Sequence, residues 1–206
     1  KILAVIPARA GSKGIPNKNI RLLGKHPLVY YSIHNALTSL YITDVIVTTD
    51  SESVRIIAQQ MGAIVRWRDD SLCGDDITLD AVIYDAIPKN EQWDYVVTMQ
   101  PTSPTLSVKT LDKAIQYAID NNLDTLISAI NDPHLSWGIY EGKKVPNYTI
   151  RLNRQYLPPC YKETGAFVIS KASVVSKDTR VGTKVDIFEM PEDESQDIDT
   201  FADLHS

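Results

Sequence analysis

The sequence predicts an α/β fold of three layers around a mostly parallel sheet, and three observations support this prediction. Short apolar segments that suit strands buried on both faces recur along the chain. Segments with helical periodicity separate most of them, and this alternating order is typical of parallel sheets covered by helices. The 206 residues, 43% of them hydrophobic and 23% charged, suit one domain with a full core.

The individual elements follow from local patterns along the chain. Residues 1–6, KILAVI, contain almost no polar group and predict the first buried strand. Residues 52–61 place apolar side chains on one helical face, and Gly62 is expected to end that helix. Ser107 is expected to cap a helix that runs to about residue 120. The other predicted strands are 44–49, 63–67, 94–99, 124–130, 165–170 and 184–190, and the other predicted helices are about 28–40 and 77–87.

The alternation is interrupted between about residues 131 and 160. This segment holds four prolines and several large aromatic side chains, which predict short strands rather than helices. Exposed aromatics in an insertion often cover a partner or close a site, although an irregular lobe explains the composition equally well. We therefore expect a single domain over residues 1–206 with an inserted arm at about 131–160.

The segment PARAGSKGIPNKN, residues 7–19, follows the first strand and is rich in glycine and basic side chains. Gly11 and Gly14 allow the backbone to approach a ligand closely. A nucleoside triphosphate carries about four negative charges, which backbone amides, Lys and Arg bind well. We therefore predict a polyphosphate site, with a solvated loop as the alternative. The segment matches neither the P-loop nor the dinucleotide-binding pattern, which argues against a P-loop kinase and a Rossmann dehydrogenase.

Charge is distributed unevenly along the chain. Residues 1–43 hold six Lys or Arg and no Asp or Glu, whereas seven Asp or Glu and no Lys or Arg lie between Lys184 and Thr200. A basic beginning and an acidic end suit a site where a divalent cation joins phosphates to carboxylates, with two unrelated surface patches as the alternative. The net charge of −5 argues against a nucleic-acid partner.

Other features of the composition concern the location of the protein. No apolar run approaches the ~18 residues needed to span a bilayer, and no signal segment opens the chain. Cys73 and Cys160 lack metal-ligand spacing, and two such thiols suit a reducing compartment. We expect a cytoplasmic protein without a membrane partner.

Four polar segments follow predicted strands, at the edge where open α/β sheets bind ligands. They are the loop from Arg9, residues 68–78, QPTSP at 100–104 and DESQDIDT at 193–200. Together they resemble the CMP-sialic acid synthetases, the N-acylneuraminate cytidylyltransferases that activate nine-carbon 2-keto-3-deoxy sugar acids. The resemblance extends from Ile2 to Leu204. The opening PARAGSKGIPNKN is close to the nucleotide loop of that family and differs from the loop of the eight-carbon Kdo cytidylyltransferases.

The resemblance implies a single α/β domain of the nucleotide-diphospho-sugar transferase type, CTP as donor, Mg²⁺ dependence, and a homodimer whose arm reaches the neighbouring site. It implies nucleotide-binding roles for Arg9, Ser12, Lys18, Asn19, Arg68 and Thr78. It implies sugar-binding roles for Gln100, Arg154, Lys162 and Thr164, with the two basic residues approaching the acidic sugar across the dimer. It implies Mg²⁺ ligation by Asp197 and Asp199, and catalytic roles for Arg9, Lys18 and Asp199.

These residue types suit the implied reaction, in which the anomeric hydroxyl of the sugar attacks the α-phosphate of CTP and pyrophosphate leaves. Such transfers depend on positioning and charge stabilisation by Lys, Arg and metal rather than on a covalent nucleophile. Mg²⁺ takes one or two protein carboxylates, so a D-x-D pair suffices. Asp199 could also receive the hydroxyl proton, with a metal-bound hydroxide as the alternative. The acidic residues of DID alone would also suit a helix N-terminus.

The sequence departs from the family at positions expected to contact the sugar. The family motif R-x-N-G is replaced by Lys162-Glu163-Thr164-Gly165, and a family tyrosine by Val168. Arg180 and Val181 stand where the family has aromatics. A threonine hydroxyl offers less than an asparagine amide to an acylamino group. We therefore expect Kdn, the sugar with a hydroxyl in place of that group, or another substituted nonulosonic acid to be a serious candidate.

Two other functions compete with this assignment. The first is another nucleotidyltransferase that forms nucleotide sugars, or a glycosyltransferase, although the latter normally carries D-x-D in the middle of the chain. The second is a catalytically silent nucleotide-binding regulatory protein. Retention of Lys18, Asp197 and Asp199 favours an active enzyme.

Overall fold

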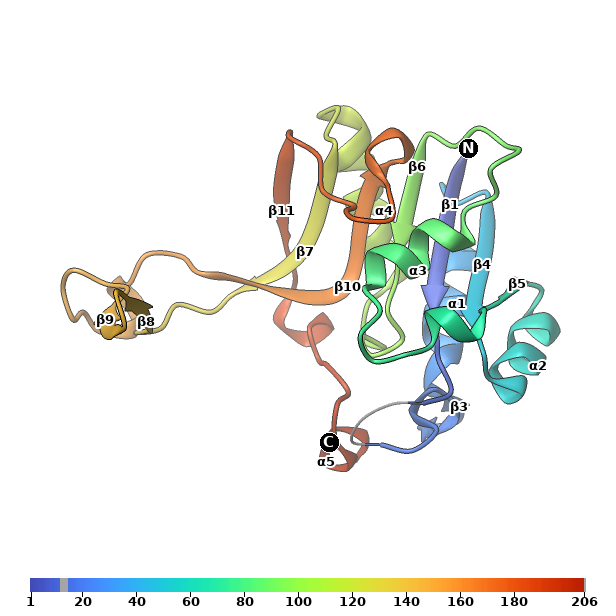
Figure 1. The fold of residues 1–206 in the computed structure, drawn as a ribbon, viewed down its shortest axis with the longest axis horizontal. Coiled ribbons are helices and arrows are strands. Elements are labelled where there is room, and N and C mark those ends of the chain that lie inside the picture. The colour runs from blue at the N-terminus through green and yellow to red at the C-terminus, as the bar shows by residue number, and fades with distance from the viewer. Residues whose placement is uncertain (12–14, 206) are drawn as a thin grey trace.

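The computed structural model describes residues 1–11 and 15–205, and a seven-stranded sheet forms its centre (Figure 1). Its strands are β1 (Ile2–Pro7), β4 (Asp44–Thr49), β5 (Ile64–Trp67), β6 (Tyr95–Thr98), β7 (Thr125–Asn131), β10 (Tyr161–Lys171) and β11 (Val185–Glu189). They lie in the order β11-β7-β10-β6-β1-β4-β5. Only β10 runs antiparallel to its neighbours within this described sheet. The predicted mostly parallel α/β sheet is therefore confirmed.

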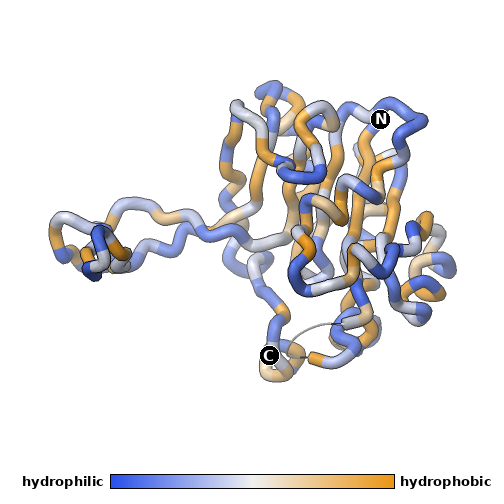
Figure 2. Tube along the Cα trace, in the orientation of Figure 1, coloured by the Kyte–Doolittle hydropathy of each residue, from blue (hydrophilic) through white to orange (hydrophobic). Residues whose placement is uncertain are grey.

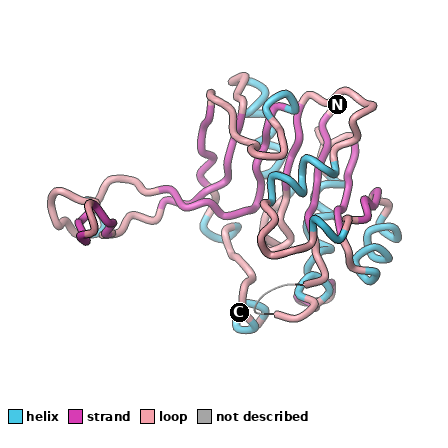
Figure 3. The backbone as a smooth tube through the Cα atoms, viewed as in Figure 1, coloured by secondary structure: helices cyan, strands magenta, loops and turns pink. Residues whose placement is uncertain are grey.

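Helices cover both faces of the sheet. They are α1 (Leu28–Thr38), α2 (Glu52–Met61), α3 (Leu79–Ala86) and α4 (Val108–Asp120), and a short α5 (Phe201–Leu204) follows near the C-terminus. Shorter elements are the pair β2 (Leu22–Leu23) and β3 (His26–Pro27), and single 3₁₀ turns at Lys18–Ile20, Asp70–Leu72, Arg154–Tyr156, Ala172–Val174 and Glu192–Glu194. Figure 3 shows how helices and strands alternate through the body of the molecule.

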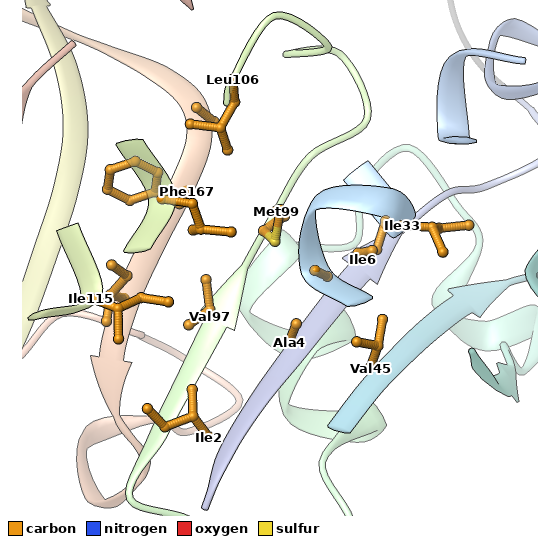
Figure 4. Close-up of a cluster of buried hydrophobic side chains, with 14 of the residues drawn as sticks. Ile2, Ala4, Ile6, Ile33, Val45, Val97, Met99, Leu106, Ile115 and Phe167 are labelled. Atoms are coloured by element: carbon orange, nitrogen blue, oxygen red, sulfur yellow. The ribbon is translucent and has the colours of Figure 1, made fainter. Parts of the chain in front are cut away.

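Alternate residues of β1 face two separate apolar clusters. Ile2, Ala4 and Ile6 pack with side chains of α1, α2 and α4 on one face (Figure 4). Leu3 and Val5 pack with α3 on the other. Burying a large aliphatic side chain stabilises a fold by about 1.5–3 kcal/mol, so a strand apolar on both sides is favourable only between two layers. The three predicted layers follow from this pattern, and Figure 2 shows the apolar strands at the centre.

Local capping sets the helix boundaries close to the predicted ones. The Ser107 hydroxyl accepts a hydrogen bond from the Thr110 amide at 3.1 Å and caps α4 as predicted. Gly62 ends α2 with a φ of 93°, in the left-handed region that favours glycine. The helix predicted from residue 77 begins at Leu79, because Thr78 serves as its N-cap.

The segment between β7 and β10 forms a long arm that projects from the body (Figure 1). It carries the antiparallel strands β8 (Trp137–Tyr140) and β9 (Lys143–Pro146), so short strands occur there as predicted. Ile139 and Tyr140 are 76% and 67% exposed, which leaves large apolar side chains in solvent.

The carboxyl ends of β1, β4 and β6 lie at one edge of the sheet because these strands are parallel neighbours. The chain after β11 returns to this same edge. There the Ile198 amide donates to the Thr102 carbonyl at 2.9 Å, and Ile198 is fully buried against Ile15 and Leu28. The segment that follows β1 and the segment that follows β11 therefore meet beside the loops at this edge of the sheet.

Candidate active site

A cavity of about 230 Å³ opens at this edge of the sheet. Polar side chains from three segments line it, namely Arg9 after β1, Arg68 and Asp75 after β5, and Gln100 after β6. Apolar side chains complete the wall, namely Pro7, Leu72, Ile77, Leu79 and Val82. An apolar cavity with a few fixed polar groups suits a small molecule, and a pyrimidine base fits this description. Three residues predicted to bind substrate thus come together here.

Arg68 is the most firmly held of these side chains. The residue is 4% exposed, and its Nη2 donates to the Thr48 carbonyl at 3.1 Å. Burial lowers the pKa of the Arg68 guanidinium, while Cys73 and Asp50 act in the opposite direction. Arginine stays protonated in proteins despite such shifts, so Arg68 is a fixed cationic donor at the cavity wall. Thr78, the other predicted cytidine contact, does not line the cavity. Its hydroxyl accepts from the Ala81 amide at 3.2 Å and caps α3.

The basic loop contributes two kinds of residue to the site. Asn19 is 7% exposed, and its Nδ2 donates to the Arg9 carbonyl at 3.0 Å. It therefore fixes the backbone that carries Arg9. Lys18 begins a 3₁₀ turn, and its side chain is only 13% exposed, with Nζ 3.8 Å from Asp199 Oδ1. Ser12, the remaining predicted phosphate contact, lies outside the described residues.

Asp197 and Asp199 stand on either side of the buried Ile198. In an extended chain alternate side chains point in opposite directions, so burial of Ile198 directs both carboxylates to the open side. Loss of solvation and the neighbouring Asp199 carboxylate raise the pKa of Asp197 to about 6, against the influence of Thr102 and Lys18. Asp197 nevertheless keeps contact with solvent. Two carboxylates this close repel each other, and a cation between them would relieve the repulsion.

The donor set of this pair fits Mg²⁺. Within residues 1–11 and 15–205, no group of three or more His, Cys, Asp and Glu is arranged to hold a metal ion. Mg²⁺ characteristically takes one or two carboxylates and fills its octahedron with phosphate oxygens and water. Asp197 and Asp199 therefore supply as many protein ligands as a phosphate-bound Mg²⁺ requires.

The predicted sugar contacts divide into three groups. Gln100 lines the cavity, and its backbone amide donates to the Gly165 carbonyl at 3.3 Å. Gly165 has a φ of 77°, which favours glycine, and a Cβ there would lie 3.4 Å from Nε2 of the Gln100 side chain. The Thr164 hydroxyl lies 2.8 Å from Ser128 Oγ and is engaged within the protein. Thr164 is not among the residues that line the cavity, so its hydroxyl has a structural role in this arrangement.

Arg154 and Lys162 form the third group; Arg154 lies on the arm and Lys162 in β10, next to the base of the arm. Arg154 is 62% exposed and donates to the Pro133 carbonyl at 2.6 Å and to Asp132 Oδ1 at 3.1 Å. Lys162 is exposed and pairs with Ile130 where the two strands leave the sheet. Arg154 is not among the residues that line the cavity of its own chain.

Sequence reasoning missed two residues that shape the site. Asp75 lines the cavity and contacts Arg9, and Thr102 holds the acidic tail through its carbonyl. Asp75 lies in the polar segment 68–78, so its position after a strand was the available signal. Nothing in the local sequence identifies its partner, since 66 residues separate Asp75 from Arg9.

This arrangement, with basic side chains and a carboxylate pair near a cavity at the carboxyl ends of the strands, agrees with the match to known proteins. The model of the cytidylyltransferase family matches residues 3–188. The protein belongs to the cytidylyltransferase family. It is therefore a nucleotidyltransferase, as the sequence predicts.

Two relatives of this cytidylyltransferase have informative names. A CMP-N,N'-diacetyllegionaminic acid synthase of Legionella pneumophila is 40% identical over 121 residues, which cover 56% of this chain and 52% of that protein. The match thus spans about half the length of that relative. A pseudaminic acid cytidylyltransferase of Campylobacter jejuni is 32% identical over 217 residues, which cover 99% of this chain and 93% of that protein.

The fold of the cytidylyltransferase also has a close counterpart among solved structures. A CMP:2-keto-3-deoxy-manno-octonic acid synthetase complexed with CTP superposes with a TM-score of 0.75 at 17% identity. The likeness covers 100% of this chain and 95% of that one, which confirms the predicted fold type. In the described part of the chain, no helix has the length and apolar character needed to cross a bilayer.

Proposed function

We propose that this cytidylyltransferase transfers CMP from CTP to a nine-carbon 2-keto-3-deoxy sugar acid, releasing pyrophosphate. One observation carries the proposal: Lys18 Nζ lies 3.8 Å from Asp199 Oδ1 beside the cavity. The predicted phosphate loop and the predicted metal ligands, from opposite ends of the chain, therefore meet next to a cavity that suits a base. The names of the Legionella and Campylobacter relatives support a nonulosonic acid as the acceptor.

The residues have distinct roles in the proposed reaction. Arg68 would bind the cytosine, and Arg9 and Lys18 the phosphates. Asp197 and Asp199 would hold Mg²⁺, which when bound neutralises phosphate charge. The shielded ammonium of Lys18 stabilises charge that develops as pyrophosphate leaves, and such preorganised groups are the main source of catalysis in phosphoryl-type transfers. Asp199 is the proposed acceptor of the hydroxyl proton.

The proposed sugar pocket lacks features that suit an acylamino group. Val168 is 8% exposed and lies in register with Thr98 inside the sheet, where it offers no polar contact. Arg180 is tied to Asp80, with Nε 2.5 Å from Oδ1. Thr164 is engaged with Ser128. These contacts support a sugar that is recognised through hydroxyl groups, as in Kdn, while the relatives' names bring legionaminic and pseudaminic acids into the comparison.

The expected sugar preference follows from hydrogen bonding. A site built to bond a hydroxyl discriminates strongly because the wrong group leaves buried partners unpaired. We expect kcat/KM for Kdn to equal or exceed that for Neu5Ac. A preference of ~100-fold for Neu5Ac, roughly 2.7 kcal/mol, would overturn this expectation.

One assay tests both the reaction and the sugar. Pyrophosphate release is followed with CTP, Mg²⁺ and a panel of Neu5Ac, Kdn, legionaminic acid, pseudaminic acid and Kdo. We expect release with at least one nine-carbon acid and a lower rate with eight-carbon Kdo. If CTP binds but none of these sugars causes release, the regulatory alternative is favoured over an active enzyme.

We also propose a homodimer joined through the arm. The exposed side chains of Trp137, Ile139 and Tyr140 support it, because monomeric proteins rarely expose such apolar groups together. In that dimer Arg154 and Lys162 would reach the sugar of the neighbouring subunit. The free thiols of Cys73 and Cys160 support the proposed cytoplasmic location.

A further inference from the structure

Two of the residues that line the cavity form an ion pair. Arg9 Nη1 lies 2.7 Å from Asp75 Oδ1, and the two side chains are 32% and 55% exposed. Arg9 belongs to the loop after β1, whereas Asp75 belongs to the segment between β5 and α3. Both line the cavity together with Arg68. The pair therefore links two segments that line the same cavity. It also places the Asp75 carboxylate against the Arg9 guanidinium, which we propose binds phosphate.

The electrostatics of the cavity explain why a carboxylate is stable there. Arg9 acts on the buried Arg68 as a like charge and lowers its pKa, after the larger influence of burial. Asp50 lies in the same region, but its Oδ1 accepts from the Ala10 amide at 2.7 Å. Asp75 is the carboxylate that contacts the Arg9 guanidinium directly. It balances the charge of Arg9 before an anionic substrate arrives.

We propose that Asp75 competes with the phosphate oxygens of the ligand for Arg9, and that it thereby weakens the binding of the product pyrophosphate. This inference rests on the proposed role of Arg9 in binding phosphates. Carboxylates and phosphates both accept hydrogen bonds from a guanidinium, so a phosphate oxygen that binds Arg9 Nη1 must displace Asp75 from it. A carboxylate at this distance also repels an approaching phosphate anion.

The competition costs both phosphate ligands the same free energy, because each must displace the same carboxylate from Arg9. CTP has additional contacts from its base and ribose to offset this cost, whereas pyrophosphate depends on the cationic groups alone. Asp75 therefore lowers the affinity for the product and speeds its release.

The test is the binding of inorganic pyrophosphate, measured by titration calorimetry without Mg²⁺ so that the carboxylate pair does not contribute. Asp75→Asn keeps the size of the side chain and removes its charge. Because partly exposed ion pairs are weak, we expect this variant to bind pyrophosphate about 2- to 5-fold more tightly, with a similar change for CTP. Asp75→Ser, a second variant, and thermal unfolding check that the effect does not come from misfolding.

Glu91→Gln is the matched control. Glu91 forms an exposed ion pair with Lys1, with Oε2 3.1 Å from Nζ, at the amino end of β1 and away from the cavity. Glu91→Gln removes one negative charge, as Asp75→Asn does, but at a position that does not line the cavity. This control variant should therefore leave pyrophosphate affinity unchanged. No tightening in Asp75→Asn, or equal tightening in Glu91→Gln, would overturn the proposal.

A double-mutant cycle with Arg9→Ala separates competition from general charge repulsion. Arg9→Ala should weaken pyrophosphate binding, and Asp75→Asn should give little tightening in that background. Equal tightening with and without Arg9 would show repulsion rather than competition. If Arg9→Ala leaves pyrophosphate affinity unchanged, Arg9 does not bind phosphate and the inference falls with that role. Pyrophosphate release from CTP and a nine-carbon acid tests the proposed function separately.

Discussion

At the scale of single residues, the site depends on charged side chains that are shielded from solvent. Lys18 is the clearest case, because its side chain is 13% exposed and lies 3.8 Å from Asp199. Asp199 is 63% exposed, so the ion pair itself is weak, and Lys18 is the partner whose charge is shielded from solvent. Lys18 and Asp199 are therefore the residues at which mutation tests the proposed chemistry most directly.

Asp199→Asn should lower turnover by at least ~100-fold, because the proposed Mg²⁺ would lose one of its two carboxylate ligands. Steady-state kinetics with saturating CTP and Mg²⁺ measure the effect. Asp193→Asn, an exposed residue in the same tail, serves as the control. Near-wild-type turnover in Asp199→Asn would remove that residue from the catalytic role.

Lys18→Ala should reduce kcat/KM for CTP by the equivalent of ~2–4 kcal/mol, the loss typical when one stabilising donor to a transition state is removed. Lys25→Ala changes an exposed lysine of the same N-terminal region and should have little effect. A change confined to the KM of the sugar would contradict the assignment of Lys18 to the phosphates.

At the scale of elements, the acidic tail is fastened to the N-terminus of α4. Glu194 Oε1 accepts from the Ser107 amide at 2.5 Å, and Oε2 accepts from the Thr110 hydroxyl at 2.7 Å. Burial alone would raise the pKa of Glu194, but these hydrogen bonds outweigh it and hold the pKa below its ordinary value. A negative charge at this helix end is also favoured by the helix dipole. The contact fixes the start of the segment that carries the two aspartates.

Glu194→Gln should therefore destabilise the protein by about 1–2 kcal/mol at pH 7. A carboxyl with a lowered folded-state pKa contributes stability above its unfolded pKa of about 4.3, and loses it as the pH falls through the folded value. The difference in unfolding free energy between wild type and variant should thus be constant from about pH 5 to 7 and shrink below about pH 4. Urea denaturation at several pH values measures it, with exposed Glu192→Gln as the control. A difference that grows on acidification would refute this role.

Local signals allowed most elements to be predicted. Caps such as Ser107 and Gly62 depend on contacts within one helical turn, so the sequence contains all the information that sets them. The helix predicted to reach about residue 40 stops at Thr38, because Ser39 is extended and the Leu40 amide donates to Asp112 Oδ2 at 3.1 Å. That acceptor belongs to α4, and a contact between distant segments leaves no local signal.

The same distinction applies to the site. Arg9, Arg68 and Gln100 could be predicted because each follows a strand at the binding edge of the sheet. The roles of Asn19 and Thr164 inside the protein, by contrast, depend on partners elsewhere in the chain that sequence spacing does not reveal.

At the scale of the whole molecule, the arm leaves its apolar side chains far from the core. We expect sedimentation at micromolar concentration to show a dimer and Ile139→Asp to shift it toward monomer, because a buried unpaired carboxylate opposes association. Leu40→Asp, at an 87% exposed site outside the arm, should leave the dimer intact. A fully active wild-type monomer would contradict both the dimer and the roles of Arg154 and Lys162 across it.

The meeting of Lys18 and Asp199 has a consequence for biosynthesis. A ribosome makes the basic loop among the first residues of this sequence and finishes all the strands of the described sheet, the last ending at Glu189, before it adds Asp197 and Asp199. The tail adds no strand to the sheet, so a chain cut short after β11 keeps every strand of the described sheet but loses both carboxylates. It also loses Ile198, which covers Ile15 and Leu28. We therefore expect an incomplete chain of this protein to expose apolar side chains at the same edge of the sheet where its carboxylates are missing.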